Sequence, residues 1–136
     1  MPPKKMRFPT SMIREAHEYK TSDYSKFVVV AESVYSSVRP YHFYQIGKIL
    51  KQTFARPKLI IDICAHVGCS TINMSSIYPN TRFISVELRK RVYNVLCENV
   101  KTFKLKTRVT PVCDNGIPFI KKLGSRIKAD FVNLDP

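Results

Sequence analysis

The fold is decided by the stretch LIIDICAHVGCST, which covers residues Leu59–Thr71. Its first part is a short apolar run with a single acid, which is typical of a strand buried on both faces of a parallel sheet. The small residues that follow, Gly68 among them, indicate a tight loop leading into a helix. We therefore expect a central strand over Leu59–Cys64 and a helix over Ser70–Tyr78.

Strand and helix patterns alternate downstream of this stretch. We expect strands at Arg82–Glu87, Thr107–Val112 and Ala129–Leu134, and helices at Lys90–Phe103 and Ile117–Leu123. Strands separated by single helices form βαβ units, in which parallel strands are joined by right-handed crossovers. The predicted fold class is therefore α/β, with a Rossmann-like parallel sheet.

The region upstream of the central strand is expected to be mainly helical. The sequence predicts a short helix over Thr10–Lys20, a strand or buried extended segment over Phe27–Ala31, and a helix that begins at Pro40. Met1–Arg7 has charges but no apolar stretch behind them, which indicates a basic arm rather than a secretory signal. We divide the chain into a basic arm with an N-terminal extension, residues 1–36, and a core, residues 37–136.

Composition places the chain among soluble globular domains and points to a polyanionic partner. The 136 residues are 44% hydrophobic and 24% charged, which excludes a disordered tail. Lys and Arg number 23 against 10 Asp and Glu, a formal net charge of +13. A basic excess of this kind most often indicates a nucleic acid partner. No apolar run approaches the ~20 residues of a membrane span.

Basic side chains gather around the helix expected at Lys90–Phe103 and its exit. Few acids interleave with them, so pairing between successive helix turns does not explain the pattern. A solvated helix face is the plainer interpretation, and an RNA surface that contacts phosphates with salt-dependent affinity is the functional one. The residues of this expected RNA surface are Arg89, Lys90, Arg91, Lys101, Lys104, Lys106 and Arg108.

Four cysteines and a group of aromatic residues are expected to be mainly structural. We expect the cysteines to behave as small buried hydrophobes with reduced thiols, which favours an intracellular compartment, cytoplasmic or nuclear. Metal binding by Cys64, His66 and Cys69 is a weaker alternative, because structural zinc pairs usually come as two C-x-x-C hooks. Core packing is preferred over base stacking for the aromatic group, whose members are Tyr35, Tyr41, His42, Phe43 and Tyr44.

Each expected strand brings an acid toward one edge of the sheet. Asp62 lies in the first strand, Glu87 ends the second, and Asp114 and Asp135 follow the third and fourth. Ligands of open α/β sheets bind beyond the carboxyl ends of the strands. An acid after the second strand can hold both hydroxyls of a ribose, and a glycine-containing loop lets backbone N–H groups approach a ligand. Such acids also commonly cap helices, but four in serial order favour a nucleoside pocket.

The segments IIDICAHVGCST, FISVELRK, VCDNG and ADFVNLDP, taken in this order, resemble class I S-adenosylmethionine-dependent methyltransferases. The resemblance is greatest to the trimethylguanosine synthases and related guanine-N2 RNA methyltransferases. Their loop D-x-F-C-G-V-G-G-N-T is matched by Asp62, Val67, Gly68 and Thr71. Their acid after the second strand corresponds to Glu87, and their N-N-A helix segment to Asn99. The resemblance covers roughly Ser37–Pro136.

This resemblance implies a sheet with strand order 3-2-1-4 and S-adenosylmethionine as cofactor. Glu87 would bind the ribose of the cofactor and Asp114 its adenine amine. Asp135 and Pro136 would begin the catalytic motif, which accepts hydrogen bonds from the exocyclic amine of the target base and positions it for methyl transfer. The implied target is an RNA base, in the first place guanine N2, with a cap guanosine as one candidate. The loop residues implied to bind the methionine end are Asp62, Cys64, Ala65, His66, Gly68 and Thr71.

Three departures from the family pattern keep alternatives open. His66 replaces a glycine, and its side chain could contact or crowd the cofactor or point into solvent, which we prefer. Cys69 stands where the family often has a second glycine. The sequence ends at Pro136, before the second proline of the motif, which would leave the fourth strand as an exposed apolar edge. The chain is then either a fragment of a longer enzyme or a truncated relative, and a non-catalytic module that binds RNA or a protein is the second function. A nicotinamide-dependent oxidoreductase ranks last, because G-x-G-x-x-G is absent.

Overall fold

The computed structural model describes residues 5–136, so the first four residues of the expected basic arm lie outside the described part. Its centre is a four-stranded parallel sheet in the order β3-β2-β1-β4. The fold class and the strand order predicted from the sequence are confirmed. The strands are β1 (Leu59–Ile63), β2 (Arg82–Glu87), β3 (Val109–Cys113) and β4 (Phe131–Leu134).

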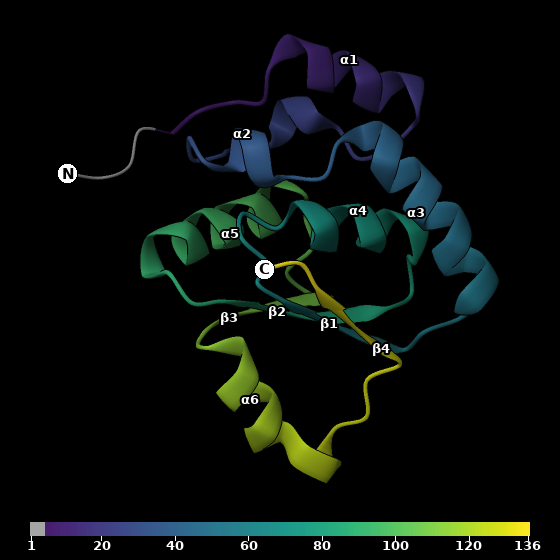
Figure 1. The fold of residues 1–136 in the computed structure, drawn as a ribbon, viewed down its shortest axis with the longest axis vertical. Coiled ribbons are helices and arrows are strands. Elements are labelled where there is room, and N and C mark those ends of the chain that lie inside the picture. Colours follow the sequence, from purple (N-terminus) through teal and green to yellow (C-terminus); the bar gives the residue numbers. More distant parts are fainter. Residues whose placement is uncertain (1–4) are drawn as a thin grey trace.

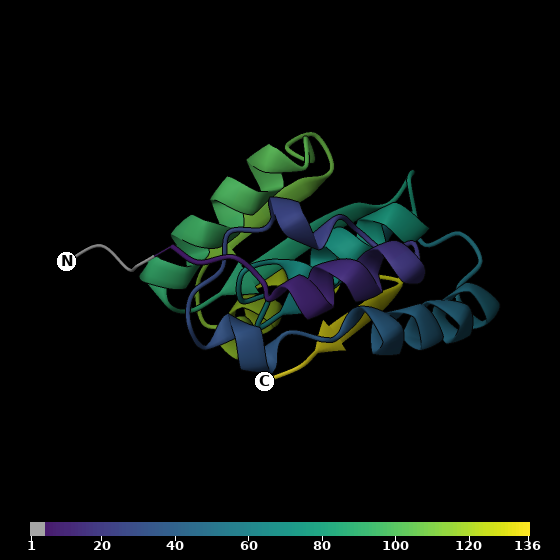
Figure 2. The same ribbon diagram turned by 90° about the horizontal axis from the view of Figure 1, so that it is seen from above.

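Helices cover the two faces of the sheet unequally. In Figure 1, α3, α4 and α5 lie against the upper face with α1 and α2 above them, whereas α6 lies below. Figure 2, seen from above, shows α1 crossing over α4, with α3 beside it. The expected helices are present, with ends that differ by one or two residues. Their bounds are α1 (Thr10–Glu18), α2 (Ser33–Ser36), α3 (Pro40–Thr53), α4 (Cys69–Ile77), α5 (Lys90–Thr102) and α6 (Gly116–Leu123), with short 3-10 turns at Tyr24–Lys26 and Gly124–Arg126.

The N-terminal extension shares one hydrophobic core with the sheet. Tyr24 and Phe27 of the extension are fully buried in the cluster that also holds Phe83 of β2 and Leu96 of α5. The segment expected at Phe27–Ala31 is buried and extended, and Val29 makes an antiparallel bridge to Met6. Burial of these large side chains from water makes the extension a contributor to the stability of the fold.

Two buried asparagines join the extension to the core. Asn99 of α5 accepts a hydrogen bond from the Val28 N–H at 2.8 Å and donates to the Val28 and Val67 carbonyls, each at 2.8 Å. Asn73 of α4 accepts from the Ser22 N–H at 3.1 Å and donates to the Tyr24 hydroxyl at 3.0 Å. Because each bond satisfies a buried polar group, loss of either side chain would leave unpaired partners in the core. Asn99, which matches the family helix segment, therefore links the extension to the loop after β1.

The expected core role of the aromatic group is wrong for most of its members. Phe43 is buried, but Tyr35, Tyr41, His42 and Tyr44 are exposed. The reason for the three residues on α3 is its orientation, which turns Phe43 and Leu50 toward the interior and leaves Tyr41, His42 and Tyr44 facing outward, whereas Tyr35 lies on the exposed side of α2. These exposed rings are therefore available to a ligand.

The cysteines are less buried than the sequence indicates. Cys69 is buried and Cys97 half-buried, but Cys64 and Cys113 are exposed. Both exposed residues lie where a strand ends, at the open edge of the sheet, so they lack neighbours on one side. All four are free thiols. Among residues 5–136 no group of three or more His, Cys, Asp or Glu side chains could hold a metal ion.

The edge strand β4 is exposed, as expected. Val132 and Leu134 are 45% and 61% exposed. Asp130 fixes the start of this strand against β1, because its carboxylate accepts the N–H groups of Lys58 and Leu59 at 2.6 and 2.9 Å. In the described part of the chain, no helix is long and apolar enough to cross a membrane.

Candidate functional site

A pocket of about 350 Å³ lies beyond the carboxyl ends of the strands. The loops that follow all four strands meet there, as expected for an open α/β sheet. The residues between α2 and α3 close it from the side of the N-terminal extension. Its lining residues are Ser36, Ser37, Val38, Cys64, Ala65, His66, Cys69, Ser70, Val86, Glu87, Leu88, Arg89, Asp114, Asn115, Gly116, Asn133, Asp135 and Pro136.

The loop after β1 is held in a tight, left-handed conformation. Cys64, His66 and Gly68 have φ values of 65°, 54° and 89°. The Ala65 N–H donates to the Val86 carbonyl at 2.8 Å, and the Gly68 N–H donates to the Ala65 carbonyl at 2.8 Å. A Cβ on Gly68 would lie 2.6 Å from Cδ1 of Leu96, so both the backbone and the space require glycine there. This geometry aims the loop at the pocket and starts α4 beside it.

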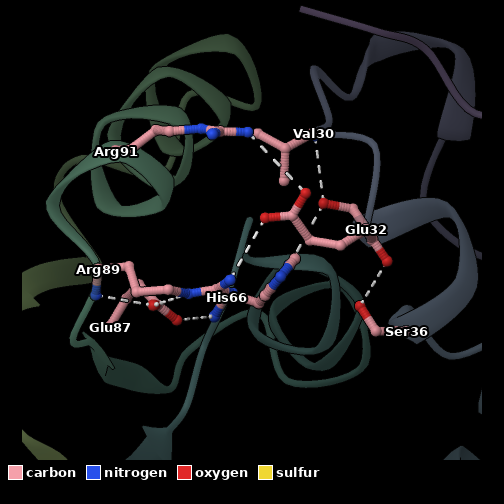
Figure 3. Close-up of polar contacts among 8 residues, drawn as sticks. Val30, Glu32, Ser36, His66, Glu87, Arg89 and Arg91 are labelled. Carbon is pink, nitrogen blue, oxygen red and sulfur yellow. Dashed lines mark hydrogen bonds and ion pairs between the residues drawn. The ribbon is translucent and has the colours of Figure 1, made fainter. Parts of the chain in front are cut away.

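Glu87 is buried at the end of β2 with its carboxylate in the pocket wall. One oxygen accepts the N–H of His66 at 3.0 Å, and the other accepts the N–H and the Nε–H of Arg89 at 2.9 and 3.3 Å. Figure 3 shows these contacts on either side of the carboxylate. Each carboxylate oxygen has two lone pairs, so the three donors leave one acceptor site, on Oε2, for a ligand. The donors therefore fix the orientation of Glu87 without saturating it.

Asp62 lies behind the pocket rather than in its wall. It is buried and accepts hydrogen bonds from the Thr71 hydroxyl at 2.5 Å and the Asn133 amide at 2.8 Å. Thr71 also contacts the Ser85 hydroxyl at 2.7 Å. Burial raises the pKa of Asp62 to about 6, although the bonds from Thr71 and Asn133 act in the opposite direction. This network joins β1, α4, β2 and β4 beneath the pocket floor.

The structure brings together seven of the ten residues expected at the site. Asp62 and Thr71 are buried beneath the pocket, and Gly68 shapes the loop without lining it. Asp114 lines the pocket, accepts the Asn115 N–H at 2.7 Å and lies 3.6 Å from Nζ of Lys122. The seven lining residues are Cys64, Ala65, His66, Glu87, Asp114, Asp135 and Pro136.

His66 does not point into solvent, contrary to the preferred interpretation. Its ring is half-buried, and Nδ1 lies 3.3 Å from the hydroxyl of Ser33, which is fully buried. Burial lowers the pKa of the imidazole, the charge of Arg89 lowers it further, and Glu87 and Glu32 oppose these effects. The short helix α2 packs over the loop and takes the ring out of water.

Ion pairs link α2 to the far wall of the pocket. Glu32, just before α2, lies 3.3 Å from Nη1 of Arg89 and 3.9 Å from Nη2 of Arg91 (Figure 3). Both arginines are exposed, so these contacts are screened by solvent and add little to stability. Their effect is to hold Arg89 beside Glu87 and α2 beside the loop.

Sequence reasoning missed the lining residues that only tertiary structure brings in. Ser36–Val38 come from the end of α2 and the segment before α3, and no local pattern connects them with the distant strand ends. Four other lining residues lie at or directly after predicted strands or loops. They are Ser70, Arg89, Asn115 and Asn133. Position after a strand is therefore the signal that could have identified these four.

A smaller depression of about 230 Å³ adjoins the pocket between α3 and β4. It shares Val38, Ser70, Asn133 and Asp135 with the pocket. Its remaining lining is apolar and consists of Phe43, Ile46, Leu50, Met74, Phe131 and Leu134. Asp135 thus lies where a polar pocket and an apolar depression meet.

The expected RNA surface is only partly free. Arg89 and Arg91 pair with Glu32, and Nζ of Lys90 lies 4.6 Å from the ring centre of Tyr93. Arg108 does not belong to this surface, because its guanidinium donates to three backbone carbonyls at 3.0–3.1 Å, those of Ser75, Tyr78 and Thr81. The exposed lysines that remain are Lys101, Lys104 and Lys106.

No family model and no curated protein matches the sequence. Solved structures do match. A proposed O-methyltransferase from Klebsiella pneumoniae has a TM-score of 0.65 at 20% identity, over 93% of this chain and 51% of that one. The O-methyltransferase TomG from Streptomyces achromogenes, solved with S-adenosylmethionine, has a TM-score of 0.65 at 12% identity, over 93% and 52%. A proposed RNA methyltransferase from Pyrococcus horikoshii has a TM-score of 0.59 at 16% identity, over 74% and 48%.

The chain therefore has the Rossmann-like fold of class I methyltransferases, and it spans about half the length of these solved structures. The resemblance read from the sequence is confirmed at the level of the fold.

Proposed function

We propose that the chain is the cofactor-binding part of an S-adenosylmethionine-dependent methyltransferase that acts on an RNA base, in the first place on guanine N2. The observation that carries the proposal is the position of Glu87. Its oriented carboxylate lies in the wall of a pocket formed by the loops after all four strands of a methyltransferase fold. A single acid in that position is suited to both hydroxyls of a ribose.

The donor set of the pocket fits the parts of the cofactor. Glu87 would accept hydrogen bonds from the ribose hydroxyls, and Asp114 from the adenine amine. The first N–H groups of α4 have no partner within the helix, and Ser70 in its first turn lines the pocket. They would bind the carboxylate of the methionine end, as helix N-termini bind anions. When bound, the cofactor supplies an electrophilic methyl group.

The depression beside the pocket is suited to the base that accepts the methyl group. Its apolar side chains would contact a flat ring, and Asp135 lies between it and the cofactor pocket. The carboxylate of Asp135 would accept a hydrogen bond from the exocyclic amine and hold the nitrogen lone pair toward the cofactor. Such a reaction depends on positioning and needs no covalent intermediate with the protein.

Charge supports RNA as the substrate. The formal net charge is +13, and Lys101, Lys104 and Lys106 are exposed at the end of α5 and after it. Together they would contact phosphates and make binding dependent on salt. One of the similar structures is a proposed RNA methyltransferase. A cap guanosine remains one candidate for the base.

A non-catalytic module that binds RNA is the second candidate. It is favoured by the three protein donors that already contact the Glu87 carboxylate and by the ion pairs that hold α2 over the loop. In this case the pocket is a structural remnant and the basic surface is the functional part.

Calorimetric titration with S-adenosylhomocysteine separates the two candidates. We expect saturable binding by the native chain and a loss of about tenfold or more in Glu87→Ala, because hydrogen bonds to a charged group disappear. Glu98→Ala is the matched control, since Glu98 lies on α5 outside the pocket and pairs with Lys5. No binding by a folded native chain would contradict the enzymatic proposal and favour the second candidate.

The target atom is tested with RNA in which inosine replaces guanosine. Inosine lacks the exocyclic amine, so a guanine-N2 enzyme would transfer labelled methyl groups to the guanosine RNA and not to its inosine counterpart. Capped and uncapped RNAs of the same sequence test the cap. Equal labelling of the guanosine and inosine RNAs would contradict guanine N2 as the acceptor.

A further inference from the structure

A second pocket, of about 260 Å³, lies between the end of α1, the middle of α3 and the end of α4. It shares no lining residue with the cofactor pocket. The first turn of α4 borders the cofactor pocket and its last turn borders this one, so the two lie at opposite ends of that helix. Its lining residues are Tyr19, Lys20, Thr21, Phe43, Tyr44, Gly47, Lys48, Lys51, Ser76 and Ile77.

The walls of this second pocket are set by backbone geometry. A Cβ on Gly47 would lie 2.9 Å from Cδ1 of Ile77, so glycine lets α3 approach α4 closely. Lys20 has a φ of 52° and turns the chain out of α1, after which the Thr21 N–H donates to the Ala16 carbonyl at 3.1 Å. The fold thus holds the ends of α1 and α4 on either side of a cavity.

The charged residues that line the second pocket are all basic. Lys20, Lys48 and Lys51 are exposed, and no Asp or Glu is among the described residues of its lining. Three lysines around one small cavity attract an anion and repel a cation. Ser76 adds one hydroxyl group to the lining, which donates to the Asn73 carbonyl at 2.7 Å. Phosphate is a ligand that lysine commonly binds in proteins.

Aromatic rings form one side of the second pocket. Tyr19 and Tyr44 have ring centres 5.4 Å apart at an angle of 41°, and Nζ of Lys48 lies 4.3 Å from the centre of the Tyr44 ring. Tyr41 lies beside Tyr19, with ring centres 5.2 Å apart. Exposed aromatic rings interleaved with basic side chains are the usual means of holding single nucleotides of an RNA or DNA strand.

We propose that this second pocket binds one nucleoside phosphate unit, either as a free nucleotide or as a nucleotide within an RNA strand. The phosphate contacts Lys48 and Lys51, and the base packs against the rings of Tyr19 and Tyr44. The volume is slightly below that of pockets for drug-sized ligands, roughly 300–1,000 Å³, which suits one nucleotide and not a longer segment. The inference does not depend on methyl transfer, because no residue is shared with the cofactor pocket.

The test is a titration followed by backbone amide NMR, with guanosine monophosphate, guanosine and a short single-stranded RNA as probes. We expect shifts at Tyr44, Lys48 and Ser76 with the monophosphate or the RNA, and much weaker ones with guanosine, which lacks the phosphate. Shifts with the monophosphate indicate a free nucleotide, and shifts with the RNA alone indicate a strand. Absence of shifts at these amides with both probes would overturn the proposal.

Two variants and a matched control assign the contacts. Lys48→Ala/Lys51→Ala is expected to weaken binding by about tenfold or more, and Tyr44→Leu to weaken it by several-fold, because stacking and charge are removed separately. Lys121→Ala/Lys128→Ala removes the same charge from α6 and the following loop, on the far side of the sheet, and should change affinity less than about twofold. Equal weakening by both lysine pairs would show a non-specific charge effect and overturn the site.

S-adenosylhomocysteine titration of the same variants distinguishes this inference from the proposed function. The lysine and tyrosine variants should bind S-adenosylhomocysteine like the native chain. Loss of both ligands in one variant, with a circular dichroism spectrum that differs from the native one, would mark that variant as misfolded. The remaining variant, which changes the other kind of contact, then tests the site.

Discussion

The two faces of the sheet differ in what covers them. On the face of α3, α4 and α5, the side chains of Ile60, Phe83 and Val109 belong to one continuous core that includes the N-terminal extension. On the other face, α6 lies below the sheet (Figure 1), and none of its residues is buried. Its Gly116 lies against the Ile63 side chain of β1. This difference indicates that burial on the first face contributes most of the folding stability. The second face is less covered, and the strand ends remain open at the pocket.

The largest expected effect on the free energy of unfolding comes from removing a buried side chain from the well-covered face. Phe83→Ala removes a fully buried ring from β2 and should lower the free energy of unfolding by about 3–5 kcal/mol. Phe119→Ala on α6 makes the same chemical change at a half-buried position. It should lower the free energy of unfolding by less than about half of the loss expected for Phe83→Ala. Urea unfolding of both variants measures the difference. Equal costs would contradict the contrast between the two faces.

The covered face is also where the sequence predicts most. Leu59–Ile63 is an apolar run with one acid, Arg82–Glu87 carries Phe, Ile and Val before a final acid, and local pattern alone predicts both as strands. The packing of Phe27 against Phe103 and the orientation of α3 that exposes Tyr44 depend on contacts distant in sequence. Helical spacing shows that a stripe is apolar, but it does not show whether a neighbour covers it. For that reason the core prediction is wrong for Tyr41, His42 and Tyr44 of α3 and correct for Phe43.

Asp62 introduces a pH dependence into the covered face. Its folded-state pKa, about 6, lies above the ordinary value of 3.8 because burial disfavours the charged form. Below pH 3.8 both folded and unfolded states hold the proton. Between pH 3.8 and about 6 the folded state holds it more tightly, so the free energy of unfolding falls as the pH rises. The complete loss is about 3 kcal/mol and is reached above that window.

Asp62→Asn tests this prediction, since the amide cannot ionise. Urea unfolding of the native chain and the variant at several pH values between about 3.5 and 7 gives the difference between the two slopes. The native chain should lose stability relative to Asp62→Asn as the pH rises. A constant difference between the two across this range would show that the Thr71 and Asn133 bonds fully compensate burial.

On the sparsely covered face, α6 lies very close to the sheet at Gly116. A Cβ at this position would lie 1.9 Å from Cγ2 of Ile63, so Gly116→Ala must displace α6 or the Ile63 side chain. Overpacking of this kind costs about 1–3 kcal/mol. In an Ile63→Ala background the added methyl group has room, and the cost of Gly116→Ala should fall close to zero. A double-mutant cycle from unfolding measurements gives this coupling, and an unchanged cost would contradict the contact.

The site was less predictable than the strands that support it. The carboxylates Glu87, Asp114 and Asp135 could be found because each directly follows or ends a strand, and parallel strands end at one edge. Asp62 lies within β1 and was expected at the same edge, but its side chain points to the covered face toward Thr71, one residue out of phase with Ile63. Side-chain direction in a strand alternates, so a single acid within a strand is placed correctly only when the buried face is known.

The smallest expected effect belongs to the outer surface of α6. Ile117 is 66% exposed, and Ile117→Ser removes little surface from contact with the protein. Its effect on the free energy of unfolding should lie within about 0.5 kcal/mol, the range of ordinary surface substitutions. Thermal and urea unfolding of the purified chain check it. A loss of about 2 kcal/mol or more, the effect of truncating a core side chain, would mean that Ile117 is buried against another surface in solution. The second face would then be covered after all, and the contrast between the two faces would hold only for the isolated chain.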